Sequence, residues 1–173
     1  MKNNRSLRRL IAGALGILIC VLAIRGEAQM QLNLPPQPGG PQYMEIMVPG
    51  NGQGFMGLAT VYNGMPVIFY DSVWVQRLGG IGSPGFRFSR AHEYGHHRRN
   101  HALQQFNSPP AMLPYLSYQE ELDADCYAVA LLRSMGDMQA VQAGFAIYQQ
   151  YVPPQDSQGR PGAINRLANM SHC

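Results

Sequence analysis

The stretch RAHEYGHHRRNH, residues 90–101, holds four of the five histidines of the chain around a single glutamate. On an α-helix His92 and His96 project from nearly the same face, because four residues rotate the helix by about 400°. Two imidazole nitrogens at this spacing can converge on one zinc ion. Glu93 is rotated by about 100° from His92, so its carboxylate falls beside the ion and can accept a proton. The pattern predicts two zinc ligands and a general base.

Zinc in a hydrolytic site takes three protein ligands and keeps one position for water, so a third ligand must come from elsewhere. The acidic stretch SYQEELDADCYAVALL supplies Glu121 and, one helical turn later, Asp125. We expect Glu121 to bind the metal and Asp125 to accept the Nδ1 proton of a ligand histidine, which fixes its tautomer. Glu120 is the alternative ligand, but a capping role already occupies it, and only Glu121 has Asp125 four residues later. The predicted cofactor is one Zn²⁺ ion.

Local signals predict that these residues lie on two helices. Ser89 can cap a first helix that continues through His101, interrupted only by Gly95. A bare backbone at Gly95 would let another element approach closely. Ser117 and Glu120 match a capping box, which predicts that the second helix begins there.

The histidine-rich stretch also has plainer interpretations. His92 and His96 could lie on a polar helix face that never meets a metal, but the Glu121 and Asp125 pair favours a metal site. His97 and His101 are also four residues apart and could bind a second ion. A histidine pair without a third ligand usually forms polar surface or packing, and we expect this of His97 and His101.

Short extended segments precede the histidines. The segment GLATVYNGMPVIFYD, residues 57–71, contains two apolar runs joined at Asn63-Gly64, which favours a tight hairpin turn. Pro66 cannot donate a ladder hydrogen bond, so its run is an edge strand or Pro66 lies just outside the pairing. If PVIFYD is an exposed edge beside the cleft, it could bind an extended peptide by strand addition. Asp71 can cap the short helix that follows.

Helical patterns dominate after the acidic stretch. The segment DMQAVQAGFAIYQQY reads as a helix capped by Asp137 and stopped by Pro153, and a short helix from Ala163 to Met170 ends the chain. Their apolar stripes are typical of core packing. The sequence therefore predicts an α+β fold, with a small antiparallel sheet packed on the active-site helix and a mainly helical C-terminal half.

The first 28 residues differ from the rest. An apolar run from Leu10 to Ile24 follows basic residues, and Gly26-Glu27-Ala28 offers small residues for a signal peptidase. We interpret residues 1–28 as a signal peptide, with an uncleaved inner-membrane anchor as the alternative. Residues 29–42, which contain LPPQPGGPQ, read as a linker or extended arm. Residues 43–173 then form one exported domain, periplasmic or secreted.

Charge and cysteines narrow the function classes. Loss of residues 1–28 removes five of 13 basic and one of 10 acidic residues, which changes the net charge from +3 to −1. The near-neutral remainder gives no reason to invoke nucleic acid, and a membrane would be contacted only through an uncleaved N-terminal segment. Cys126 and Cys173 could form a disulfide in an oxidising compartment or stay as separate thiols.

The motifs HEYGH and ELDAD, whose glutamate follows the last histidine by 25 residues, resemble the gluzincin group of zinc metallopeptidases. In that group H-E-x-x-H and a downstream E-x-x-x-D provide the site. The stretch RPGAINRL is similar to a proline-arginine element of membrane-associated stress and prenyl-protein gluzincins, which commonly opens with histidine-proline. Arg160 stands where that histidine would be. The resemblance spans about residues 59–168, and in size the chain is closer to the minimal soluble gluzincins.

The resemblance implies a zincin-like fold and a zinc-dependent endopeptidase acting on a protein or peptide. Glu93 would accept the proton of an activated water, and Arg166 would pair with Asp125 or orient substrate. The candidate donors to the oxyanion are Tyr94, Tyr118, Tyr148, Tyr151 and Arg166. One alternative is a non-catalytic metal-binding or chaperone-like envelope protein with the same ligand geometry. Another is an inactive scaffold whose histidines meet no metal.

Overall fold

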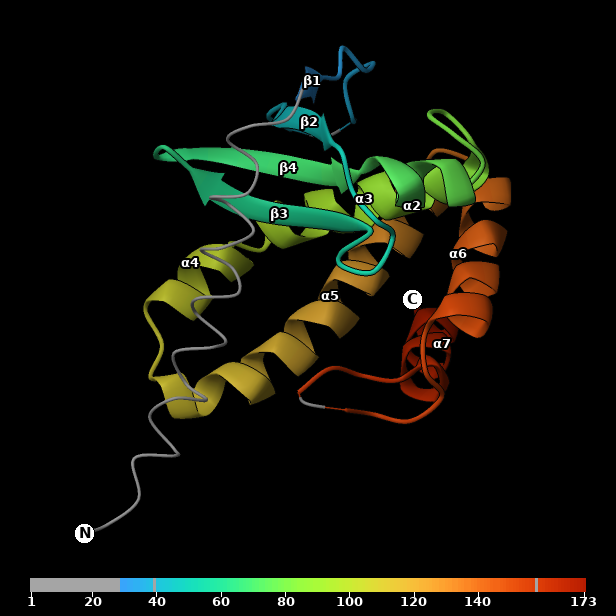
Figure 1. The fold of residues 1–173 in the computed structure, drawn as a ribbon. Helices are drawn as coiled ribbons and strands as arrows, with labels where there is room; N and C mark the ends of the chain where they lie inside the picture. The colour runs from blue at the N-terminus through green and yellow to red at the C-terminus, as the bar shows by residue number, and fades with distance from the viewer. Residues whose placement is uncertain (1–28, 39, 158) are drawn as a thin grey trace, which may run out of the picture.

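The computed structural model describes residues 29–38, 40–157 and 159–173 (Figure 1). The signal peptide expected at residues 1–28 lies outside the described residues. Within the described ranges, none of the helices combines the length and apolar character that a membrane span needs. In chain order the elements are β1 (Met30–Gln31), β2 (Met44–Val48), β3 (Gly57–Tyr62), β4 (Met65–Asp71), α2 (Ser72–Arg77), α3 (Pro84–Arg98), α4 (His101–Phe106), η1 (Pro110–Met112), α5 (Leu113–Ser134), α6 (Met138–Tyr151) and α7 (Ala163–His172).

The strands form one mixed sheet in the order β1-β2-β4-β3. β4 runs parallel to β2 and antiparallel to β3. The prediction that PVIFYD forms an edge was therefore wrong, and the sheet is not purely antiparallel. β3 is the edge strand on this side.

Pro66 fits a central strand for two reasons. The pairing of β4 with β2 begins only at Val67, so Pro66 lies just outside it, as the alternative prediction allowed. On the other side Pro66 faces Val61 of β3. The N–H of Ala59 points away from β4, because it donates to Glu93. Backbone groups alternate in direction along a strand, so Val61, two residues later, also points its N–H away from β4. Val61 and Pro66 therefore form a pair that exchanges no hydrogen bonds.

The turn before β4 and the helix cap after it are both those predicted from the sequence. Asn63 and Gly64 have φ angles of 50° and 77°, as a two-residue hairpin turn requires, so the predicted turn is confirmed. At the other end Asp71 caps α2, where its Oδ1 accepts from the N–H groups of Val73 and Trp74 at 2.7 and 3.1 Å. The predicted cap at Asp71 is also confirmed.

The helix that carries the histidines begins earlier than predicted. Ser83, not Ser89, is its N-cap: the Ser83 hydroxyl accepts from the N–H of Phe86, and proline occupies the first helical position. The helix also ends earlier, at Arg98, because Asn100 adopts a left-handed conformation with φ 58°. His101 therefore opens a separate helix, α4, and the prediction of one continuous helix was wrong.

The acidic helix α5 begins at Leu113, before the predicted capping box. Glu120 does not cap it: its side chain is buried and accepts a hydrogen bond from Gln105 of α4. Proline at position 114 starts the helix instead, since proline suits the first turn. Asp137 caps α6 as predicted, with its carboxylate accepting from the N–H of Ala140 at 3.1 Å.

The helix α3 lies at the centre of the fold. One side packs on the sheet, where Ile68 and Tyr70 of β4 meet Phe86 and Tyr94 of α3. The other side packs on α5 and α6, and α7 covers both of these helices (Figure 1). The predicted α+β class with a mainly helical C-terminal half is confirmed.

Two further contacts fix the ends of the described chain. In the segment predicted as a linker or arm, β1 pairs with β2, and the carbonyl of Pro35 accepts from the Arg90 guanidinium at 2.8 Å. At the C-terminus a disulfide joins Cys126 of α5 to Cys173, the last residue. The disulfide holds α7 against α5.

Candidate metal centre

Three side chains from two helices converge on one point. His92 and His96 extend from α3, and their Nε2 atoms lie 3.1 Å apart. Glu121 of α5 places Oε2 3.5 Å from Nε2 of His92. The ligand atoms of the three residues all lie within 4.8 Å of one another.

The two separations that involve His92 fit a single metal ion. Bonds of about 2.0–2.1 Å in a tetrahedral zinc site put neighbouring ligand atoms about 3.3–3.5 Å apart. The observed 3.1 and 3.5 Å are close to these values. The predicted group His92, His96 and Glu121 could therefore hold a metal ion, and it is the one such group found among the described residues.

The two helices approach closely because Gly95 has no side chain. A Cβ at Gly95 would lie 3.1 Å from Cα and 3.2 Å from the carbonyl oxygen of Ala124 in α5, and 3.2 Å from Cβ of Tyr127. Gly95 stands between the two ligand histidines, and Ala124 stands between Glu121 and Asp125 in sequence. The bare backbone at Gly95 lets α5 approach α3 closely, as expected, and this approach sets the distance between the candidate ligands.

Glu93 lies against the edge of the sheet. Its Oε2 accepts a hydrogen bond of 2.8 Å from the N–H of Ala59 in β3. The approach depends on Gly57, where a Cβ would lie 2.6 Å from Cγ of Glu93. Burial raises the pKa of Glu93 to about 7, a value suited to a group that accepts and returns a proton near neutral pH.

Asp125 and Arg166 lie directly behind the candidate ligands, but the hydrogen bond expected from Nδ1 of a ligand histidine to Asp125 is not formed. Asp125 has no exposed surface, and its Oδ1 lies 2.9 Å from Nδ1 of His92, within ion-pair distance but not aligned for a hydrogen bond. Arg166 of α7 donates to both oxygens of Asp125 at 2.7 and 2.8 Å. The same guanidinium lies 3.0 Å from Oε2 of Glu121. Tyr148 of α6 adds a hydrogen bond to Asp125.

Charges inside the site shift the pKa values of the ligands. Burial would lower the pKa of His92, but the adjacent carboxylates of Asp125 and Glu121 raise it to about 10. Burial and the neighbouring His92 lower the pKa of His96 to about 3. Burial alone would raise the pKa of Glu121, yet contact with His92 and Arg166 holds it well below its usual range. At neutral pH a proton on His92 therefore competes with a cation.

The structure separates the candidate oxyanion donors. Tyr94 is wrong for this role, because its hydroxyl contacts Glu45 and Gln42 in the layer between α3 and the sheet. Tyr118 has its hydroxyl on Asn165, and Tyr151 packs edge-on against Trp74. The remaining two candidates, Tyr148 and Arg166, both contact Asp125.

His97 and His101 do not join in a second metal site among the described residues. His97 behaves as the packing alternative predicted: its Nε2 lies 3.0 Å from the carbonyl of Val67, and its ring packs on Tyr43. His101 behaves differently. It is buried, and its Nδ1 lies 3.0 Å from Nδ1 of His96, a contact that the sequence reasoning missed.

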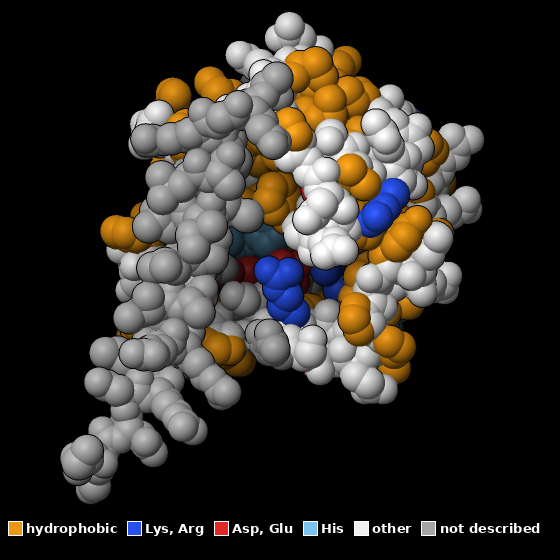
Figure 2. All heavy atoms as spheres, in the orientation of Figure 1, with side chains coloured by type: hydrophobic (Ala, Val, Ile, Leu, Met, Phe, Trp, Pro, Cys, Tyr) orange, Lys and Arg blue, Asp and Glu red, His pale blue; other side chains and the backbone are white. Residues whose placement is uncertain are grey.

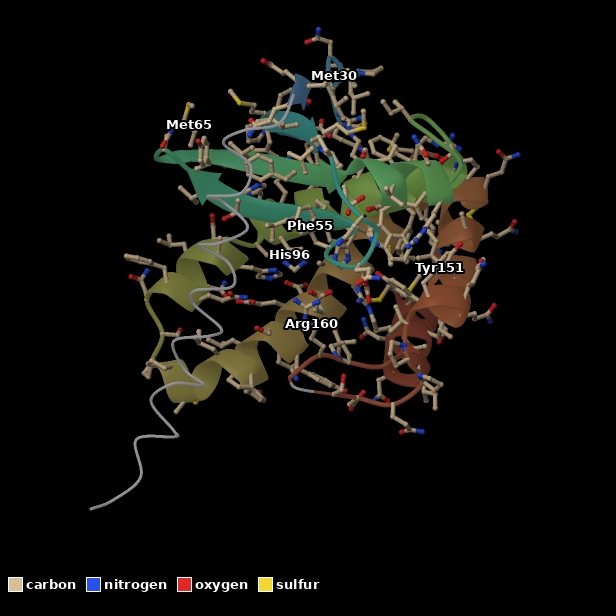
Figure 3. All side chains as sticks on the ribbon, viewed as in Figure 1. Met30, Phe55, Met65, His96, Tyr151 and Arg160 are labelled. Atoms are coloured by element: carbon tan, nitrogen blue, oxygen red, sulfur yellow. A yellow bond between two sulfur atoms is a disulfide. The ribbon has the colours of Figure 1, made fainter. Side chains whose placement is uncertain are left out.

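The site opens into a hollow. Figure 2 shows histidine and acidic side chains deep within it and basic side chains at its edge. In Figure 3, viewed from the same side, His96 and Phe55 lie above Arg160. Arg160 belongs to the loop before α7. Comparison with family models, curated proteins and solved structures finds no match for this chain.

Proposed function

We propose that this chain is a zinc-dependent endopeptidase that hydrolyses peptide bonds in the cell envelope or outside the cell. The observation that carries the proposal is the convergence of His92, His96 and Glu121 on one point, with Glu93 beside them and Asp125 behind. The apolar N-terminal run supports an exported location. The resemblance of HEYGH and ELDAD to gluzincin motifs supports the same reaction.

The reaction uses the residues in distinct roles. A zinc ion held by the three ligands would supply a polarised water and a Lewis acid for the substrate carbonyl. Glu93 accepts the proton of the attacking water and delivers it to the nitrogen of the departing amine. Asp125 and Arg166 hold the ligand carboxylate and histidine in place from behind.

The edge strand β3 is the element suited to bind an extended substrate. The N–H of Ala59 points to the edge of the sheet, since it reaches Glu93 rather than β4. Backbone groups along this edge can pair with a peptide, which gives affinity with little selectivity for side chains. This moves the predicted binding strand from PVIFYD to residues 57–62.

A non-catalytic metal-binding protein would share the ligands, so the test must separate binding from hydrolysis. Glu93→Gln keeps an oxygen that can accept from Ala59 and leaves all three ligands intact. We expect this variant to retain one zinc ion per chain by metal analysis and to lose about 10²- to 10⁴-fold in peptide cleavage. Glu121→Gln, as the matched variant, should lose zinc affinity as well.

Two results would overturn the proposal. Cleavage by Glu93→Gln at the rate of the unchanged chain would remove Glu93 from the reaction. Zinc bound by the unchanged chain without hydrolysis of any peptide in a mixed library would favour the metal-binding alternative instead.

A further inference from the structure

A third histidine contacts the site from outside the motif. His101 is the first residue of α4, and only 3% of its surface is exposed. Its Nδ1 lies 3.0 Å from Nδ1 of His96, and its Nε2 lies 3.2 Å from Oδ2 of Asp123 in α5. We call His96, His101 and Asp123 the imidazole chain.

The left-handed residue Asn100 creates this contact. In one continuous helix, residue 101 would be rotated by about 500°, or 140° net, from His96 and would face away from it. Asn100, with φ 58° and ψ 32°, breaks the helix after Arg98 and redirects α4. Asparagine is one of the few residues that adopt this conformation at small cost. The break therefore turns His101 back onto His96.

The positions of the protons in the imidazole chain follow from metal binding. His96 Nε2 faces His92 Nε2 and is the atom available to a cation, so it must carry a lone pair. A neutral His96 then holds its proton on Nδ1 and donates it to Nδ1 of His101. His101 must in turn hold its proton on Nε2, where the carboxylate of Asp123 accepts it. Every donor in the chain meets an acceptor.

The helix α5 thus supports both ligand histidines. Asp125 lies behind His92, and Asp123, two residues earlier, supports His96 through His101. Asp123 is partly exposed and its Oδ2 also lies 3.4 Å from Nε of Arg99, so the imidazole chain leads from His96 to the surface. Outer partners that orient a ligand ring typically change metal affinity by about 10- to 100-fold when removed.

We propose that His101 and Asp123 are positioning residues that orient His96 and fix its tautomer for metal binding. This inference rests on the metal site of the proposed function, but not on peptide hydrolysis. This role differs from simple packing, because Nδ1 of His101 must accept a hydrogen bond and Nε2 of His101 must donate one.

Two substitutions at His101 distinguish orientation from packing. His101→Phe keeps a planar ring and removes both hydrogen bonds, so zinc affinity, measured by competition with a chelator, should fall by about 10- to 100-fold. His101→Gln can accept from His96 through its oxygen and donate to Asp123 through its nitrogen. We expect its zinc affinity to stay within about threefold of the unchanged chain.

His97→Phe is the matched control. It replaces a histidine of the same helix region that packs on Tyr43 and contacts the carbonyl of Val67, outside the imidazole chain. It should leave zinc affinity unchanged even where it lowers the melting temperature. Circular dichroism of each variant establishes that it is folded before the titration.

A spectroscopic readout tests the tautomers directly. In the zinc-loaded chain, ¹⁵N shifts should place the proton of His96 on Nδ1 and that of His101 on Nε2. Equal zinc affinity of His101→Phe and the unchanged chain, equal losses in His101→Phe and His101→Gln, or the opposite tautomers would each overturn the inference. Zinc binding with these tautomers but without peptide cleavage would overturn the proposed function and leave this inference standing.

Discussion

Replacing Gly95 by alanine tests whether helix spacing sets the metal site. Gly95 is the point where α3 contacts α5, between the two ligand histidines. An added Cβ would meet Cα of Ala124 at 3.1 Å, whereas an ordinary contact between carbon atoms is about 3.5–4.0 Å. The helices must therefore separate by about 0.4 Å or more.

The size of this shift determines how much zinc affinity should fall. A metal site tolerates changes of about 0.2 Å in its ligand distances, so a shift of about 0.4 Å between α3 and α5 exceeds the tolerance. We expect Gly95→Ala to weaken zinc binding by about tenfold, equivalent to about 1.4 kcal/mol. The unfolding free energy should fall by about 0–2 kcal/mol, because the alanine gains about 1 kcal/mol in helix propensity and loses about 1–3 kcal/mol to overpacking.

The assay combines zinc competition with chemical denaturation, and Gly85→Ala provides the control. Gly85 lies in the first turn of the same helix, about two turns before His92, and a Cβ there would meet the carbonyl oxygen of Leu78 at 2.8 Å. This variant should lose stability and keep its zinc affinity. If Gly95→Ala binds zinc as tightly as the unchanged chain, or both variants weaken binding equally, the reasoning about helix spacing is refuted.

Three further predictions follow from the charges and the cross-link. Because the pKa of His92 is raised to about 10, His92 stays protonated across the neutral range, and zinc affinity should rise by about tenfold per pH unit between pH 6 and 8. Calorimetry in two buffers should detect about one proton released per zinc ion bound. Zinc binding without proton release would contradict this prediction. Arg166→Met removes one of the two cations beside the fully buried Asp125, the other being the protonated His92, and should lower the unfolding free energy in urea by about 3–5 kcal/mol. A loss below about 1 kcal/mol would show that the pair of Arg166 and Asp125 contributes little. Reduction of the disulfide between Cys126 and Cys173, which are 47 residues apart, should lower the unfolding free energy by about 2–4 kcal/mol. Identical urea unfolding curves with and without reductant would refute this prediction.

The grouping of His92, His96 and Glu121 could be predicted because helix geometry is local. A spacing of four residues places two side chains on one face whatever the rest of the chain does, and this holds for His92 with His96 and for Glu121 with Asp125. The site needs only that the two faces meet. Gly95 gave a signal in the sequence that another element could approach this face closely.

The errors concern choices that local patterns leave open. Ser83 and Ser89 are both possible caps, and the proline after Ser83 decides between them. Pro66 forbids pairing only through its own N–H, so it does not exclude a central strand once the neighbours are in the right register. Such register is a long-range property, which a hydrophobic pattern alone does not specify.

His101 was missed for a different reason. Its contact with His96 depends on one backbone angle, at Asn100, and a continuous helix would have hidden it. Asparagine after two arginines is a weak signal, but it is the residue type that permits the turn. Glu120 was misassigned because a capping box and a buried acid that accepts from Gln105 look alike in sequence.

The attachments of α5 fix its rotation about its own axis. Within six residues the helix supplies the candidate metal ligand Glu121, the proposed supports Asp123 and Asp125, and the cross-linked Cys126. A single residue inserted inside this stretch would rotate all later residues of the helix by about 100°. Glu121 could then no longer face the histidines while Cys126 still reached Cys173. The same insertion in the loop at residues 107–109, ahead of η1, would leave the stretch whole. Changes of length during divergence of this chain are therefore expected upstream of α5 and not within it.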